Sequence, residues 1–159
     1  INVCVYDDYS IDGCAIKPSK IGLGGAFIDS GINVLSMIKC WLPFNNVVLL
    51  GYESKRCIQS NLVIKADVDL LIDGVNVHIC IDWTTKKSNK ETSIIYKGRK
   101  IDINNLLQTI YDGDNVINVE EMNRLDAHYY NLFRLLVGEP NYLEETKLHS
   151  LLFDINEKL

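Results

Sequence analysis

Residues 62–83 read LVIKADVDLLIDGVNVHICIDW and decide the fold class of this chain. The Asp73-Gly74 pair inside this stretch is a strong signal for a two-residue β-hairpin turn. After the turn, apolar and polar residues alternate from Val75 to Trp83, which is the period of a strand with one buried face. The stretch therefore predicts two antiparallel strands, Leu62–Ile72 and Val75–Trp83.

Further strands are predicted on both sides of this hairpin. Gly98 and Asp112-Gly113-Asp114 mark two more hairpin turns, and the polar residues 84–90 are expected to form a turn as well. The remaining strands are expected at residues 2–6, 47–50, 93–96, 100–103, 106–111 and 115–119. Because hairpin turns dominate the chain, we expect an antiparallel sheet.

Helical periodicity is expected in three places. Residues 30–41 place Ile32, Leu35, Met37, Ile38 and Trp41 on one apolar face, and Pro43 ends the helix. Residues 122–137 and 144–159 repeat leucine and aromatic side chains at helical spacing. One helix, a meander of strands and two further helices predict the α+β class.

Size and charge narrow the classes of function. The chain has 159 residues, which suits one domain, and a net charge of −5, which argues against nucleic acid as a main partner. No apolar run approaches the length of a membrane span. The chain starts as a strand at Ile1 without an initiator methionine, so we expect it to be a piece of a longer protein without a signal peptide.

The cysteines and histidines favour neither disulfides nor a metal site. Five cysteines occur at irregular spacings without a CxxC motif, and the three histidines are scattered along the chain. Paired ligands at short spacing are what a structural zinc site needs. We therefore expect no metal, and reduced, mostly buried thiols in a cytoplasmic protein.

The polar pair Asp29 and Asn33 is the best candidate for chemistry. The two residues are four apart at the start of an apolar helix, so they share a helix face. A carboxylate and a carboxamide at this spacing can grip a polyol or serve a proton transfer. The alternative is structural, with Asp29 as a helix N-cap and Asn33 as a solvated surface group.

Three other motifs have structural alternatives. The glycines of residues 22–27 lack the third glycine of a dinucleotide-binding loop, because Phe27 stands there. Gly24-Gly25 instead suits a place where backbones pack closely or approach a ligand. Asp82-Trp83 can hold a sugar ring beside a carboxylate, or can be an edge acid and a packed tryptophan, and His78 lies on the polar face of its strand.

Residues 24–36 read GGAFIDSGINVLS and resemble the GG-x-x-x-D-P-G-I-N-A-L-S segment of bacterial galactose and arabinose 1-dehydrogenases. These enzymes belong to the glucose–fructose oxidoreductase/inositol dehydrogenase (Gfo/Idh/MocA) family. The strand that ends at Asp82-Trp83 is similar to one ending in F-D-W, and residues 130–137 resemble a Y-x-x-F-x-x-L-I helix. The order and spacing of the three segments extend the resemblance over essentially the whole chain.

The resemblance implies a two-domain NAD(P)-dependent sugar dehydrogenase. Residues 1–159 would form its C-terminal domain, which binds the substrate and pairs subunits, and a Rossmann domain outside this chain would bind NAD or NADP. The implied domain is an open antiparallel sheet with helices packed on one face. The other face would pair with a second subunit in a homo-oligomer such as a dimer.

The resemblance also implies roles for particular residues. Asp29 and Asn33 would be catalytic and face the sugar and the nicotinamide. Gly25 would join Asn33 at the cofactor, and Asp82 and Trp83 are candidates for the sugar pocket. The family's catalytic lysine belongs to the Rossmann domain, so we expect the isolated chain to be inactive.

Two further functions stay open. Ser30 stands where the related segment has proline, and the catalytic lysine is absent from this chain. The chain can therefore also be a non-catalytic dimerisation or ligand-binding module that has lost its Rossmann domain. A regulatory protein that senses a sugar is the third reading.

Overall fold

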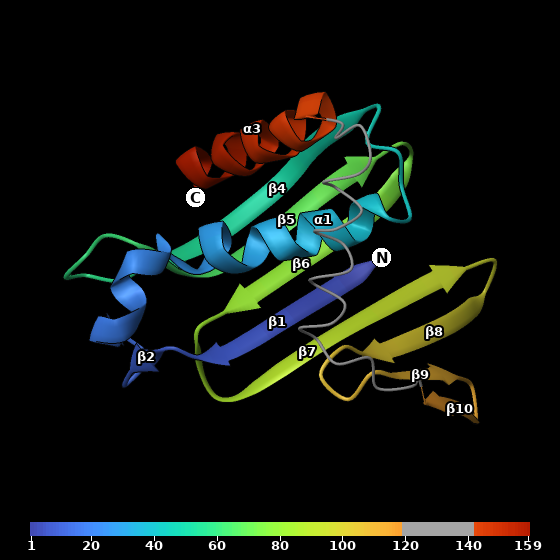
Figure 1. Ribbon diagram of the computed structural model, residues 1–159, viewed down its shortest axis with the longest axis horizontal. Coiled ribbons are helices and arrows are strands. Elements are labelled where there is room, and N and C mark those ends of the chain that lie inside the picture. Colours follow the sequence, from blue (N-terminus) through green and yellow to red (C-terminus); the bar gives the residue numbers. More distant parts are fainter. Residues whose placement is uncertain (119–141) are drawn as a thin grey trace.

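The computed structural model describes residues 1–118 and 142–159, and Figure 1 shows the arrangement of its elements. Eight strands form one sheet in the order β10-β9-β8-β7-β1-β6-β5-β4. They are β1 (Asn2–Asp8), β4 (Val47–Arg56), β5 (Val63–Ile72), β6 (Val75–Asp82), β7 (Thr84–Tyr96), β8 (Arg99–Asn104), β9 (Thr109–Asp112) and β10 (Asn115–Asn118). A small ribbon, β2 (Ser10–Ile11) and β3 (Ala15–Ile16), follows β1.

The described helices cover one face of the sheet. They are the 3-10 helix η1 (Pro18–Leu23), the π-helical turn η2 (Phe27–Gly31), α1 (Ile32–Lys39) and α3 (Tyr142–Lys158). Figure 1 shows α1 and α3 in front of β4, β5 and β6, while β7 to β10 extend beyond them. This arrangement confirms the expected α+β class with helices packed on one face.

One strand pair departs from the antiparallel expectation. The chain turns back between β6 and β7, but these two strands do not pair with each other, because β1 lies between them. A strand inserted between two neighbours of opposite direction must run parallel to one of them. β1 is antiparallel to β7 and parallel to β6, so the sheet is mixed at this one pair.

Residues 84–90 were the clearest error in the predicted elements. The sequence predicts a polar turn there, whereas β7 begins at Thr84 and runs to Tyr96. β1 supplies the reason, because it pairs with this segment in the register Val5↔Lys90 and Tyr6↔Asn89. Pairing with β1 satisfies the backbone hydrogen bonds of this polar segment. The local sequence pattern does not show that this partner strand is available.

The helices also differ from the predicted bounds. Helical structure starts at Phe27, as a π-helical turn, and α1 ends at Lys39, so Trp41 lies beyond the helix and is exposed. The last helix is close to the prediction, at Tyr142–Lys158. The predicted helix 122–137 lies outside the described residues.

The three predicted hairpin turns are present. Asp73 and Gly74 have φ angles of 48° and 82°, which is the left-handed pair that a two-residue turn of this type needs. Gly98 and Gly113 also have positive φ and link β7 to β8 and β9 to β10. Local sequence chemistry therefore determined these turns.

The hydrophobic core lies between the sheet and the helices. Its fully buried side chains come from η2 and α1 (Phe27, Leu35 and Ile38), from β5 and β6 (Ile64, Leu70, Ile72, Ile79 and Ile81), from Trp83 and from α3 (Ile155). In the part of the chain that is described, no helix is long and apolar enough to cross a membrane.

Candidate functional site

A cleft of about 330 Å³ opens between the η2–α1 helix and the strands β1 and β7. Asp29 and Asn33, the pair that the sequence singled out, both line it. The other described residues that line it are Val3, Val5, Asp7, Tyr9, Ser30, Val34, Met37, Lys90 and Asn105. The cleft therefore combines an apolar floor with carboxylates, amides, a phenol and one ammonium group.

The helix fixes the relation between Asp29 and Asn33. The Asn33 Nδ2 donates a hydrogen bond of 2.9 Å to the backbone oxygen of Asp29, one helical turn earlier. This bond orients the amide, and no bond from the described residues reaches its Oδ1 acceptor. The N-cap alternative for Asp29 is wrong, because Asp29 lies inside η2, which begins after Ala26 without a side-chain cap.

Burial and charge raise the pKa of the Asp29 carboxyl above its ordinary value. Burial is the larger cause, and the negative charge of Asp7 adds to it, while Lys90 and Lys20 act in the opposite direction. Desolvation disfavours the ionised form of a carboxyl group. Asp29 is thus a stronger proton acceptor than a solvated aspartate, which is what a general base requires.

Asp7 and Lys90 both line the cleft and form an ion pair there, and the sequence analysis missed both. Asp7 is only 4% exposed, and the Lys90 Nζ lies 3.9 Å from its Oδ2. A buried carboxylate needs such a partner, because isolated burial of a charge is costly. No local pattern predicted this pair, because residues 84–93 are all polar and show no alternation with apolar residues.

Asn105 ties the rim of the cleft to β7. Its backbone N–H donates to the Lys90 oxygen at 2.8 Å, and its Nδ2 donates to the Thr92 Oγ1 at 3.0 Å. Both contacts join the loop after β8 to the strand that carries Lys90. The polar side of the cleft is therefore held in place by the sheet.

Gly25 has a structural role beneath the cleft. Its φ is +103°, and a Cβ on it would lie 3.0 Å from the backbone oxygen of Val63. The missing side chain lets the chain just before η2 approach the backbone of β5 closely. Gly25 is buried and is absent from the described lining of the cleft. Its contact with a cofactor stays a prediction.

Asp82 and Trp83 also lie outside the described lining of this cleft. The Asp82 Oδ1 accepts hydrogen bonds from the Thr84 N–H at 2.7 Å and the Thr84 Oγ1 at 2.6 Å. Trp83 is fully buried, and its ring meets Tyr9 edge-on with centroids 5.1 Å apart. A buried ring offers no platform for a sugar, so Tyr9 is the aromatic residue at the cleft.

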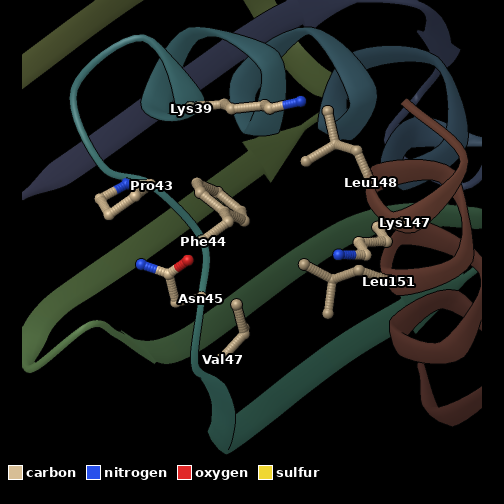
Figure 2. A pocket seen from close by; sticks show the side chains of 8 residues that line it. All are labelled: Lys39, Pro43, Phe44, Asn45, Val47, Lys147, Leu148 and Leu151. Carbon is tan, nitrogen blue, oxygen red and sulfur yellow. The ribbon is translucent and has the colours of Figure 1, made fainter. Parts of the chain in front are cut away.

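A second cavity, of about 370 Å³, lies beside α3 and is shown in Figure 2. Lys39 and Lys147 extend along it from α1 and α3, and Phe44, Leu148 and Leu151 form apolar walls. Its described lining contains no carboxylate. It therefore lacks the proton acceptor that the Asp29 cleft offers, and we keep that cleft as the candidate active site.

Metal-binding clusters and disulfides are absent from the described residues. No group of three or more His, Cys, Asp or Glu side chains could hold a metal ion there. All five cysteines are free thiols. The expectation that most of them are buried is wrong, because Cys14 and Cys40 are exposed and Cys4 is partly exposed.

Comparisons with known proteins find likeness in structure only. No family model matches the sequence, and no curated protein matches it. The fold matches UDP-N-acetylglucosamine 3-dehydrogenase GnnA from Acidithiobacillus ferrooxidans with a TM-score of 0.77 and 10% identity, over 98% of this chain and 51% of that one. It matches D-galactose-1-dehydrogenase from Rhizobium etli with a TM-score of 0.64 and 20% identity, over 85% and 44%.

A third match is KijD10, a 3-ketoreductase from Actinomadura kijaniata, in a complex with TDP-benzene and NADP. The TM-score is 0.70 at 13% identity, over 97% of this chain and 52% of that one. The chain therefore spans about half the length of these proteins. These three matches are oxidoreductases of the glucose–fructose oxidoreductase/inositol dehydrogenase family, which confirms the predicted resemblance at the level of the fold.

Proposed function

We propose that this chain is the C-terminal, substrate-binding domain of an NAD(P)-dependent sugar dehydrogenase. One observation supports this most directly: Asp29 and Asn33 line the same cleft, on a fold shared with sugar dehydrogenases. The proposal includes a Rossmann domain outside residues 1–159, because this chain spans about half the length of those proteins.

Oxidation of a sugar hydroxyl requires one group that accepts the proton from the oxygen and another that accepts the hydride from the carbon. In our proposal, Asp29 receives the hydroxyl proton or positions the hydroxyl for a lysine of the Rossmann domain. Its raised pKa makes proton uptake more favourable than at a solvated aspartate. A nicotinamide, when bound, supplies the hydride acceptor.

The remaining polar residues of the cleft suit a polyol. Asn33 presents an amide whose Oδ1 can accept from a sugar hydroxyl or from a carboxamide, so it fits the nicotinamide end of the cofactor. Tyr9 and Asn105 add donors and acceptors on the strand side. Asp82 is held by Thr84 and contributes to the sugar pocket only if that turn rearranges.

We propose an aldose as the substrate, with oxidation at C1. The support is the GGAFIDSGINVLS segment, whose Asn33 matches the 1-dehydrogenase branch of the resemblance. Fold alone does not select the carbon, since the structures with this fold include both a 3-dehydrogenase and a 1-dehydrogenase. In this proposal, residues of the Rossmann domain determine whether NAD or NADP is bound.

We also propose that the domain pairs with a second copy through the sheet face away from the helices, in the cytoplasm. Val48, Leu50 and Ile95 are 51%, 57% and 62% exposed, and β-sheet register places Val48 and Ile95 on that face. Burial of such exposed apolar side chains against a second copy removes apolar surface from water and so favours association. Five free thiols suit a reducing compartment.

The test uses the full protein as its source cell makes it. Its intact mass is measured first, followed by aldose-dependent reduction of NAD+ and NADP+. We expect Asp29→Asn to lower kcat by roughly 10²–10⁴-fold and Asn33→Ala mainly to raise KM. Asp114→Asn, in the exposed turn between β9 and β10, is the matched control with unchanged turnover.

Two outcomes would contradict the proposal. Unchanged turnover in Asp29→Asn would remove Asp29 from the mechanism. A native mass of one domain, with no turnover but with sugar binding, would favour the ligand-binding module instead.

A further inference from the structure

Cys4 and Cys80 face each other at the centre of the sheet, on the side away from the helices. They are direct partners in the register of the parallel pair β1–β6. Their neighbours along each strand, Val3 and Ile79, point to the opposite face and belong to the core. Cys80 is 8% exposed yet stands outside the core cluster, so the two thiols form a separate pair.

A tyrosine lies beside the two cysteines. The Cys80 thiol donates a hydrogen bond to the Tyr6 hydroxyl, with the Sγ 3.9 Å from the oxygen. The Cys80 side chain is the largest cause that lowers the pKa of Cys4, to about 6, and the Tyr6 hydroxyl contributes less. The contact with Cys4 is the largest cause that raises the pKa values of Cys80 and Tyr6, and burial raises both further.

The charged groups around the pair lie on β6 itself and on two further strands, β5 and β7. His78 lowers the pKa of Cys4, while burial and Glu91 on β7 oppose this. Asp67 on β5 lies opposite Cys80 and raises the pKa of that thiol. Lys65 pairs with Asp67 at 3.5 Å. These groups favour ionisation of Cys4 over ionisation of Cys80.

We propose that Cys4 and Cys80 form a peroxide-reactive thiol pair, in which Cys4 is the nucleophile and Cys80 the resolving thiol. A site of this kind needs one thiolate with a second thiol within bonding reach. Neighbouring strands lie roughly 4.8 Å apart, which is inside the Cα separation of about 4.4–6.8 Å that a disulfide spans. In-register partners on one sheet face therefore meet the geometric requirement.

The reaction balances with hydrogen peroxide as the oxidant. The Cys4 thiolate attacks one oxygen, the O–O bond breaks, and the departing hydroxide takes up the proton that Cys4 had released to become water. Cys4 is then a sulfenic acid. The Cys80 sulfur attacks the Cys4 sulfur, the S–O bond breaks, and the hydroxyl leaves as a second water with the Cys80 proton. Two thiols are oxidised to a disulfide that joins β1 to β6.

The experiment treats the full protein with hydrogen peroxide at neutral pH, alkylates the remaining thiols in acid and maps the peptides by mass spectrometry. We expect a Cys4–Cys80 cross-link that dithiothreitol reverses. Cys80→Ser should instead stop at a Cys4 sulfenic acid, which dimedone captures. Cys40→Ser, at an exposed cysteine, is the matched control and should leave the cross-link unchanged.

A second readout uses the wild-type protein and does not depend on a variant folding. The rate of Cys4 alkylation by iodoacetamide should rise with a pH midpoint near 6, whereas free cysteine, alkylated in parallel as the reference thiol, has a midpoint of about 8.5. A partner on this sheet face would slow both reactions. Alkylation and oxidation are therefore followed to completion at a protein concentration where light scattering reports single chains.

The proposal is overturned if Cys14 or Cys40 is oxidised while Cys4 and Cys80 remain alkylatable thiols. It is also overturned if the midpoint of Cys4 alkylation equals that of free cysteine. Neither readout needs a sugar, a nicotinamide or turnover, so its failure is distinct from failure of the proposed dehydrogenase.

Discussion

The two faces of the eight-stranded sheet differ in what they bury. The face beneath α1 and α3 carries fully buried apolar side chains, among them Ile79 and Ile81 of β6. The opposite face carries Tyr6, Cys4, His78 and Asp69 at its centre, with Val48 and Ile95 exposed further out. Strand alternation sends neighbouring residues of the same strands to these two environments.

The difference between the two faces shows which face contributes most to stability and which carries interacting polar groups. The helix-covered face supplies most of the apolar burial, and the candidate active site lies at its edge, where the Asp29 cleft borders the core. The open face contributes little burial but holds polar groups that interact with one another. Substitutions on the two faces should therefore differ in kind as well as in size.

The largest expected effect is the loss of Trp83. Trp83→Ala removes a fully buried ring that packs on Tyr9 and should lower the free energy of unfolding by roughly 3–5 kcal/mol. At a protein concentration where only single chains are present, Ile95→Ala on the open face should change it by less than about 0.5 kcal/mol, because Ile95 is 62% exposed in the single chain. Urea denaturation of both variants measures the contrast. Equal losses would show that the open face is buried in solution.

The next effect concerns the packing of η2 on the sheet. Gly25→Ala should lower stability by roughly 1–3 kcal/mol, because Gly25 has a φ of +103° and a Cβ would meet the Val63 oxygen. Gly22→Ala is the matched control, since nothing lies within 4 Å of a Cβ there. Thermal denaturation of the two variants separates them. Similar melting temperatures would contradict the close approach.

A smaller effect tests the contact in the cleft between the buried Asp7 and the partly exposed Lys90. Lys90→Met should lower stability by about 1–2 kcal/mol, because the Asp7 carboxylate is 4% exposed and would lose its cation. The same substitution should raise the pKa of Asp29 further, since Lys90 lowers it. Carboxyl NMR titration measures that pKa. Adding Asp7→Asn should recover part of the stability, and a strictly additive double variant would contradict the pairing.

The smallest effect is a gain from removing the Asp29 charge. The folded pKa of Asp29 is raised, so its ionisation costs stability as pH rises from the ordinary value of 3.8 through the folded value. Asp29→Asn should therefore raise the melting temperature by about 1–2 °C at pH 7 and lose this advantage below pH 3.8. Calorimetry at both pH values tests it. An advantage that is independent of pH would contradict the assignment.

Local sequence patterns predicted much of the fold and the Asp29–Asn33 part of the candidate site. Asp73-Gly74 specified its turn because only a few residue types adopt left-handed φ easily. The spacing of Asp29 and Asn33 specified a shared helix face, which the bond between them confirms. The strand from Val75 could be predicted equally well, because aliphatic residues occupy every second position.

Lys90 and Asp7 show why the rest of the candidate site could not be predicted from the sequence. Neither residue is unusual in its own segment, and residues 84–90 even resemble a solvated turn. They become a pair only because β1 inserts between β6 and β7 and sets the register Val5↔Lys90. Cys4 and Cys80 meet through the same insertion, although many residues separate them along the chain.

The sequence by itself determined the turns, the alternating strands, the helix face of Asp29 and Asn33 and the α+β class, since each depends on residues close in the chain. The tertiary structure decided the placement of β1, the parallel pair, the buried Asp7–Lys90 contact and the burial of Trp83. These features depend on which strand edges meet. That choice follows from the burial of the whole core, which no short stretch of sequence encodes.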